Sequence, residues 1–454
     1  TSQVRGIGDP LVAAYLRCYV ARVGASVTPG VAHVSSGVHD YLFAYPSMLS
    51  DATRARLQAL SVTPGEYLVL QSPALEWVFA AMGRSASKEE FQEVMQHYRD
   101  FCGSRLVLRC ILSSFDASLY NNNATAVAAL ARAASEEGAP LVDTYRVLAD
   151  RLAVAPPPEE MRLPLLNEVW KTVSKCDDLR LYVGCALSWL EVLLRHYSER
   201  EVHVLLGDLT SKLDRLADAV DETVVRRLES MVGSLILHAQ RDGGSSLLTS
   251  EHLLRLLDVF RGPRRVEMCK DILAAFGRSS EKTGDAVLIH TLFDIARTLH
   301  DSIDSLSPEA ERKQVSGLVC MLLDRIDLGR DLERQLSVYV EARALFSQLD
   351  AITARLVLCV AELSIKACRY VKGRHTKKTA AFVKACLAYC HITIPSIADA
   401  FTRLELLLHC SHAALLNQCL PQTDTFLKAA ISLVPEIPPH QEVEQKRVHT
   451  EQRL

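Results

Sequence analysis

The sequence lacks the motifs by which many enzymes and nucleotide-binding proteins are identified. It has no phosphate-binding loop, because Gly243-Gly244-Ser245-Ser246 is not followed by a Lys-Ser/Thr pair. It also has no G-x-S-x-G nucleophile turn and no H-E-x-x-H zinc motif. We therefore expect a protein that is not an enzyme, with no catalytic residues and no cofactor.

Aromatic residues are few, and the sequence has no long apolar run and no large excess of one charge. Aromatics make up 6% of the chain, while the helix-forming residues Leu and Ala are abundant, which favours helices over strands. No run approaches the roughly 20 apolar residues that cross a bilayer, so we expect no direct membrane insertion. The 51 basic and 54 acidic residues give a net charge of −3, which provides no electrostatic reason to expect nucleic acid as a partner.

The 13 cysteines do not suggest a disulfide framework, because they are odd in number and scattered through apolar patterns. We interpret them as reduced, buried residues of a cytoplasmic protein. One group, Cys386, Cys390, His409 and His412, could supply four zinc ligands, and an all-α zinc-dependent enzyme is the alternative that it leaves open. Because these residues stand in apolar helical sequence rather than in turn-rich loops, we expect no metal there.

What the sequence does contain is helical periodicity. Val315, Leu318, Val319, Leu322, Leu323 and Ile326 have the spacing of one helix face. Ser87-Lys-Glu-Glu90 and Ser198-Glu-Arg-Glu201 have the spacing of capping boxes. Short breaks rich in proline or glycine, such as Ala155–Pro158, separate the periodic segments. The pattern predicts an all-α fold, an α-solenoid of HEAT-like antiparallel helix pairs.

No long linker interrupts this pattern, although 454 residues exceed one compact core. We expect a single α-solenoid over residues 1–438, with an N-terminal half at 1–240 and a C-terminal half at 245–438. The final segment, 439–454, loses the apolar period, and we expect it to be disordered. A different helical-repeat scaffold, for transport or for a membrane coat, also fits these observations.

Several non-repetitive segments identify a family. They are Gly8–Gly24 (GDPLVAAYLRCYVARVG), Pro164–Lys175 (PLLNEVWKTVSK), Gly329–Leu349 (GRDLERQLSVYVEARALFSQL), His375–Cys390 (HTKKTAAFVKACLAYC), Ile392–His409 (ITIPSIADAFTRLELLLH) and Asn417–Pro438 (NQCLPQTDTFLKAAISLVPEIP). In this order they resemble the large α-solenoid subunit of retriever, the endosomal recycling complex related to retromer. That family extends beyond both ends of the sequence, so we expect the chain to be a fragment.

The resemblance implies a non-enzymatic scaffold that holds partner subunits while membrane proteins return from endosomes to the plasma membrane. The implied partners are an arrestin-like small subunit, a metallophosphoesterase-fold subunit, an assembly of coiled-coil and copper-metabolism-domain proteins, and, indirectly, a sorting nexin that selects cargo. The implied location is cytoplasmic, peripheral on endosomes.

Candidate partner-binding residues follow from the resemblance together with charge and aromatic content. For the phosphoesterase-like subunit they are Arg330, Asp331, Arg334, Tyr339, Arg343, Arg374, His375 and Lys377. We expect Tyr339 to be an accessible anchor among these charges, since Tyr and Arg are favoured in interfaces. For the arrestin-like subunit the candidates are Asp9, Tyr15 and Tyr19.

Overall fold

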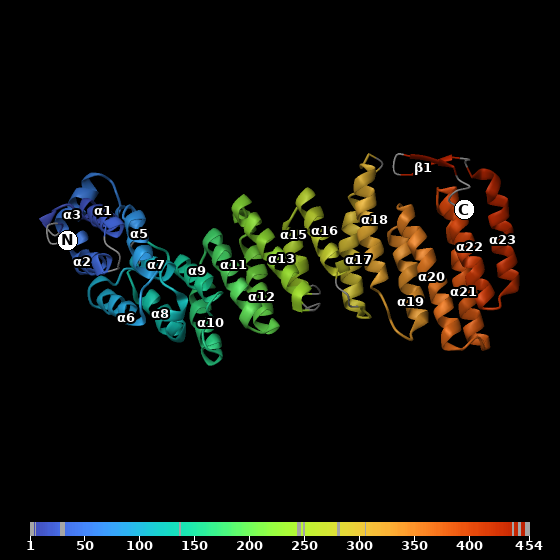
Figure 1. The fold of residues 1–454 in the computed structure, drawn as a ribbon, viewed down its shortest axis with the longest axis horizontal. Helices are drawn as coiled ribbons and strands as arrows, with labels where there is room; N and C mark the ends of the chain where they lie inside the picture. Colours follow the sequence, from blue (N-terminus) through green and yellow to red (C-terminus); the bar gives the residue numbers. More distant parts are fainter. Residues whose placement is uncertain are drawn as a thin grey trace. The chain divides into compact units, whose positions relative to one another are not determined.

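The computed structural model describes residues 4, 6–27, 32–135, 138–242, 247, 250–278, 282–304, 306–437, 440–443 and 446–449. The chain divides into two compact units, Thr1–Leu235 (unit 1) and Ile236–Leu454 (unit 2). Helices dominate both units, as Figure 1 shows. The predicted all-α solenoid fold is therefore confirmed.

Unit 1 is a succession of helices joined by short connections. They are α1 (Pro10–Val27), α2 (Ala32–Met48), α3 (Asp51–Ala59), α4 (Pro64–Val69), α5 (Ser72–Gly83), α6 (Lys88–His97), the π-helical turn η2 (Tyr98–Cys102), α7 (Arg105–Ser114), η3 (Ala117–Leu119), η4 (Asn121–Asn123), α8 (Ala124–Ala133), α9 (Leu141–Leu152), α10 (Glu159–Val173), α11 (Leu179–His196), α12 (Glu199–Arg215) and η5 (Ala217–Ala219). Helix α13 (Glu222–Asp242) contains the boundary between the units.

Unit 2 continues the same plan. Its helices are α15 (Glu251–Val259), α16 (Pro263–Arg278), α17 (Ala286–Asp301), α18 (Glu309–Asp324), α19 (Leu332–Leu345), α20 (Asp350–Tyr370), α21 (Lys377–Thr393), η6 (Ile394–Ser396), α22 (Ala400–Leu416), α23 (Leu420–Leu433) and η7 (Val434–Glu436). Two short strands, β1 (His440–Val443) and β2 (Lys446–His449), pair antiparallel after them.

The helix ends follow from the local sequence. Ser87 and Ser198 form the predicted capping boxes with Glu90 and Glu201 at the starts of α6 and α12. These reciprocal bonds satisfy amide protons that have no partner inside the helix. The break at Ala155–Pro158 falls between α9 and α10 as expected. Pro46 and Pro164, in contrast, lie inside α2 and α10, so proline does not end every helix of this chain.

The helices form two layers within each unit. In unit 1, α5, α7, α9 and α11 pack one on the next, and α8 packs on α10 in the second layer. In unit 2, α16, α18, α20 and α22 succeed one another, and α20 also contacts α19 and α21. Each helix pair thus covers the apolar faces of its neighbours, which is how a helical repeat builds a continuous core.

Large side chains fill the interior of these layers. Trp189 of α11 is fully buried, and its indole Nε1 donates a hydrogen bond to the carbonyl oxygen of Tyr145 on α9, 3.2 Å away. Asp208 of α12 accepts hydrogen bonds from Trp170 Nε1 at 2.9 Å and from the hydroxyl of Tyr182 at 2.7 Å. The polar atoms of Trp189, Trp170 and Tyr182 are therefore paired, as a close-packed interior favours.

The structure bears on two expected domain limits, the boundary between the halves and the start of a disordered tail. The boundary between the units follows Leu235. The limits of the two halves, 1–240 and 245–438, and a single solenoid over residues 1–438 stay predictions. The segment 439–454, expected to be disordered, holds the two-stranded hairpin β1–β2, whose register pairs His440 with His449. The remaining residues of that segment lie outside the described part of the chain.

Candidate partner-binding surface

The two segments of unit 2 in which the sequence predicts a binding surface lie next to each other. Lys378 at the start of α21 has its Nζ atom 3.3 Å from Oε1 of Glu333 on α19. The hydroxyl of Tyr370, at the end of α20, donates a hydrogen bond to the carbonyl oxygen of Gly329 at 3.3 Å. The start of α19 and the loop before α21 therefore lie side by side at one end of the helices α19 to α21.

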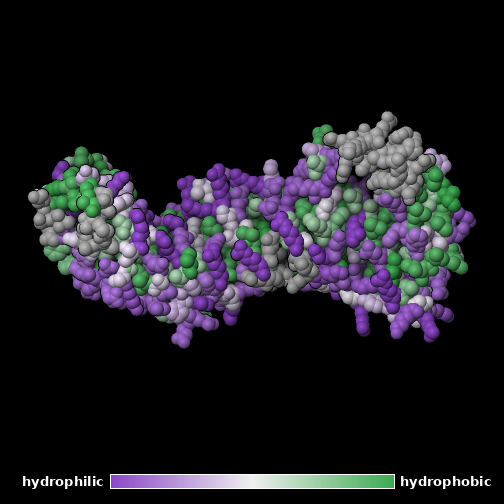
Figure 2. All heavy atoms as spheres, viewed as in Figure 1, coloured by the Kyte–Doolittle hydropathy of each residue, from purple (hydrophilic) through white to green (hydrophobic). Residues whose placement is uncertain are grey.

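This end of the helices α19 to α21 carries many exposed cations. We name as the basic rim the exposed residues Arg330, Arg334, Arg369, Lys372, Arg374, Lys377 and Lys378. Only Asp331 and Glu333 oppose them on the start of α19. Hydrophilic side chains project over the ends of α19 to α21 in Figure 2. Four of the predicted contact residues, Arg330, Arg334, Arg374 and Lys377, belong to the rim.

The prediction that Tyr339 is an accessible anchor is wrong. Its side chain is only 4% exposed, because α19 turns this face toward α20. Its hydroxyl accepts a hydrogen bond from Nε2 of Gln335 at 2.9 Å, and the same amide donates to the carbonyl oxygen of Ile326 at 3.2 Å. Burial first, and then the neighbouring Cys359, raises the pKa of Tyr339. Tyr339 is a core residue beside a polar pocket of about 130 Å³.

Three further predicted contact residues have internal roles. Asp331 caps α19 by accepting a hydrogen bond from the amide of Arg334 at 3.1 Å. Arg343 lies half-buried with its guanidinium over the ring of Tyr389, 5.5 Å from the ring centre. His375 is half-buried, and both of its ring nitrogens are shielded without a hydrogen bond. Of these three side chains, only that of Asp331 is exposed.

Sequence reasoning missed an apolar surface farther along α21, toward its C-terminal end. A groove of about 250 Å³, which we name the apolar groove, is lined by Lys384, Leu387, Ala388, His391 and Ile392 of α21 and by Gln422, Thr425 and Phe426 of α23. The rings of His391 and Phe426 meet edge to face across it, 5.7 Å apart.

Exposed apolar side chains extend from the groove over α23. Ile392 is 66% exposed and Ile431 is 70% exposed. Figure 2 shows apolar side chains gathered over α23. The sequence held a signal for this surface, since the apolar stripes of the two long helical segments in 374–435 are too broad for one buried face.

The candidates at the start of unit 1 have mixed roles. Asp9 caps α1, because its Oδ1 accepts hydrogen bonds from the amides of Leu11 at 3.0 Å and Val12 at 3.1 Å. The Tyr15 hydroxyl donates to the carbonyl oxygen of Leu70 at 2.9 Å, which ties α1 to the end of α4. Tyr19 is 64% exposed. Of the three, Tyr19 presents the most free surface to a partner.

The cysteine and histidine group of α21 and α22 is not assembled as a metal site. Cys386, Cys390 and Cys410 are buried, whereas His412 is exposed. Burial raises the pKa of the Cys386 thiol to about 12, so the thiol stays protonated, which disfavours metal binding. Among the described residues, the group that does bring three ligand atoms together is in unit 1, where His39, Glu93 and His97 meet.

Comparison with known proteins identifies the family. The family model described as the VPS35L C-terminal domain matches residues 86–454, and a second one, described as VPS35L, matches residues 1–70. The chain belongs to the VPS35L family. The prediction made from the segments quoted above is thereby confirmed.

Individual relatives are similar along nearly the whole chain. The human and mouse proteins named VPS35 endosomal protein-sorting factor-like are each 37% identical over 441 residues, which cover 96% of this chain and 45% of the relative. The Dictyostelium discoideum protein of the same name is 36% identical over 447 residues, or 98% of this chain and 45% of the relative. The chain thus spans about half the length of the curated relatives it matches.

The similarity to solved structures is weak, and the helices do not have the character of membrane spans. A solved circular tandem repeat protein covers 94% of this chain at 12% identity with a TM-score of 0.26, too low to carry an argument. Within the described ranges, no helix is both long and apolar enough to cross a membrane.

Proposed function

We propose that this chain acts as a non-enzymatic scaffold in an endosomal, retriever-like recycling complex. The observation that carries the proposal is the similarity to endosomal protein-sorting factors over 96% of the chain. The helical layers support it, because stacked helix pairs give long surfaces on which several proteins can bind at once. On this proposal the protein acts in the cytoplasm, peripherally on endosomes.

We propose that the metallophosphoesterase-fold subunit binds unit 2 at the basic rim and at the apolar groove. The basic rim and the apolar groove both involve α21, so one partner can contact both. Exposed charges steer the encounter of two proteins, and apolar side chains that fill a pocket supply most of the binding energy. The partner's surface should therefore combine acidic residues with an apolar side chain that enters the groove.

The other proposed partners are assigned less narrowly. The arrestin-like small subunit would meet the start of unit 1 near Tyr19, whose ring is exposed. The coiled-coil and copper-metabolism-domain assembly, and the sorting nexin acting through it, have no residues assigned on this chain. A transport or coat scaffold of another complex is the competing function.

Affinity purification with mass spectrometry tests the proposed function. The tagged chain is expressed in cells of a species that carries a close relative, and the proteins recovered with it are identified. We expect enrichment of the phosphoesterase-fold subunit together with endosomal sorting proteins. Enrichment of coat or nuclear-transport components instead, or recovery of no endosomal protein above an empty-tag control, would overturn the proposal.

A further inference from the structure

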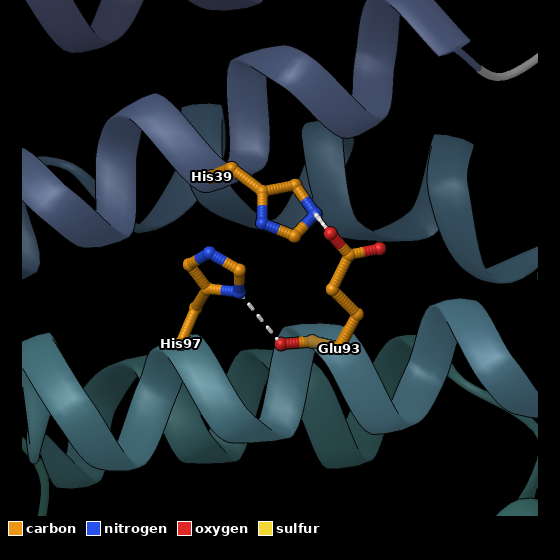
Figure 3. Close-up of side chains that lie close together, drawn as sticks. All are labelled: His39, Glu93 and His97. Carbon is orange, nitrogen blue, oxygen red and sulfur yellow. Dashed lines mark hydrogen bonds and ion pairs between the residues drawn. The ribbon is translucent and has the colours of Figure 1, made fainter.

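Three side chains of unit 1, all of types that can bind metals, converge between two helices. His39 comes from α2, and Glu93 and His97 come from α6, one helical turn apart. Figure 3 shows the two imidazole rings and the carboxylate turned toward one another. One ligand atom of each residue lies within 4.8 Å of the other two.

His39 has no adequate hydrogen-bond partner. Its side chain is 17% exposed, and both of its ring nitrogens are shielded from water without a hydrogen bond. The nearest charged atom, Oε1 of Glu93, lies 4.0 Å from His39 Nε2, too far for a hydrogen bond. Polar atoms that are buried without a partner are costly, so native structures usually satisfy them, by protein, water or an ion.

His97 is held in the orientation typical of a ligand. Its Nδ1 lies 2.8 Å from the carbonyl oxygen of Glu93 and donates a hydrogen bond to it. This bond places the proton on Nδ1 and leaves the lone pair on Nε2. Metal-binding histidines nearly always have such an anchor on the nitrogen that does not touch the metal.

The backbone beside the three side chains is also irregular. Directly after His97 the helix changes to the π-helical turn η2, a distortion frequent at functional sites.

We propose that His39, Glu93 and His97 bind one divalent transition-metal ion, Zn²⁺ by preference, with water as the fourth ligand. Two imidazole nitrogens and one carboxylate oxygen are a common zinc ligand set, with bonds of about 2.0–2.2 Å. Tetrahedral coordination at these lengths brings ligand atoms to roughly 3.3 Å from one another. Exposed Glu93 has the freedom to close the remaining distance.

The bound ion would cross-link α2 to α6 within unit 1. This site is separate from the cysteine and histidine group of unit 2, and it departs from the expectation of a metal-free protein. Neither of its helices carries residues of the basic rim or the apolar groove, so the metal would stabilise unit 1 rather than form the partner surface of unit 2.

The test is a titration of the tag-free, chelator-treated 454-residue chain with Zn²⁺, followed by calorimetry. We compare the wild type with Glu93→Gln, which keeps the shape of an exposed side chain, and with His97→Gln. The control is His412→Gln, at an exposed histidine of α22 outside this group. We expect one equivalent of Zn²⁺ to bind, with affinity at least about tenfold lower in both variants and unchanged in the control, since even loss of an outer-shell partner costs 10–100-fold.

Two additional readouts keep the test independent of folding defects. Zn²⁺ should raise the melting temperature of the wild type and of His412→Gln but not of Glu93→Gln. Co²⁺ should give the visible absorption of a tetrahedral site in the wild type, but not in Glu93→Gln or His97→Gln. Absence of saturable binding, or equal affinity in the wild type and Glu93→Gln, would overturn the proposal.

Discussion

Arg343 packs against Tyr389, with its guanidinium carbon 5.5 Å from the centre of the tyrosine ring. The contact joins α19 to α21 at one end of these helices, while Lys378 and Glu333 join them at the other end. The two helices therefore lie in one layer beside α20. Their contacts hold the residues of the basic rim in place.

Replacing Arg343 should affect stability more than partner binding. A cation over an aromatic ring contributes about 0.5–1 kcal/mol when partly exposed, and the aliphatic part of arginine adds packing. Arg343→Ala should therefore lower the free energy of unfolding by about 1 kcal/mol, measured by urea denaturation. Arg343→Lys should recover part of the loss. If Arg343→Ala leaves stability unchanged but abolishes recovery of the phosphoesterase-fold subunit, Arg343 belongs to the interface after all.

Tyr339 should likewise behave as a core residue. Tyr339→Phe removes the hydroxyl that accepts from Gln335 Nε2, although that amide keeps its bond to Ile326, so we expect a loss of about 1 kcal/mol. Tyr339→Ala also leaves a cavity and should cost about 3–5 kcal/mol. Chemical denaturation measures both losses. Normal stability of Tyr339→Ala would contradict the buried position.

The burial of Tyr339 is not visible in the sequence. Apolar periodicity correctly predicts the helices around it, and the capping boxes at Ser87 and Ser198 correctly predict where helices begin. A tyrosine among charges, however, has the same pattern whether it faces solvent or the next helix layer. Its burial depends on how α19 meets α20, a tertiary contact that periodicity along one helix does not encode.

The candidate sites also depend on tertiary contacts that the sequence pattern does not reveal. The adjacency of Gly329 to the loop before α21 was predictable only through the family resemblance, because 41 residues separate Gly329 from its hydrogen-bond partner Tyr370. The His39, Glu93 and His97 group joins residues of two helices more than 50 positions apart, and only the i, i+4 spacing of Glu93 and His97 is visible in the sequence. The exposed face of α23 was signalled by its broad apolar stripe.

Acid should destabilise unit 1 through Asp143. Burial raises the pKa of Asp143, but the hydrogen bonds and charges of Arg109 and Arg146 more than offset this, and the net pKa lies below its usual value. Arg109 Nη1 lies 2.9 Å from Oδ2, and Arg146 Nε lies 2.9 Å from Oδ1. Because the folded-state pKa is depressed, the stabilisation is complete above the unfolded-state pKa near 4 and is lost as pH falls through the lower folded-state value.

Asp143→Asn tests this dependence. At neutral pH the variant should unfold about 1–3 kcal/mol more easily, since hydrogen bonds to charged groups are lost. Its stability should then fall less steeply than that of the wild type below pH 4. Asp424→Asn, at an exposed i, i+4 pair with Lys428 on α23, is the control, with an expected change of about 0.5 kcal/mol or less. Parallel acid profiles of Asp143→Asn and the wild type would rule out this role.

The buried cysteines should resist alkylation in the folded protein. Burial raises the pKa of Cys110, Cys359 and Cys386 to about 12 in each case, so almost no thiolate forms at pH 8. Half-buried Cys176 and Cys419 should react with iodoacetamide first, as peptide mass spectrometry would show. In denaturant all five should react at similar rates. Early labelling of Cys386 in the native chain would contradict its position between α21 and its neighbours.

The most direct test of the scaffold proposal measures how fast the metallophosphoesterase-fold subunit associates with purified variants of this chain, and whether it stays bound. The account predicts that the wild type retains the subunit and that Arg330→Glu/Lys377→Glu, which reverses two charges of the basic rim, slows association about tenfold or more at low salt. The matched control Arg297→Glu/Lys313→Glu, at exposed cations of α17 and α18, should bind like the wild type. Failure of the wild type to bind, or wild-type association by the rim variant, would contradict the account.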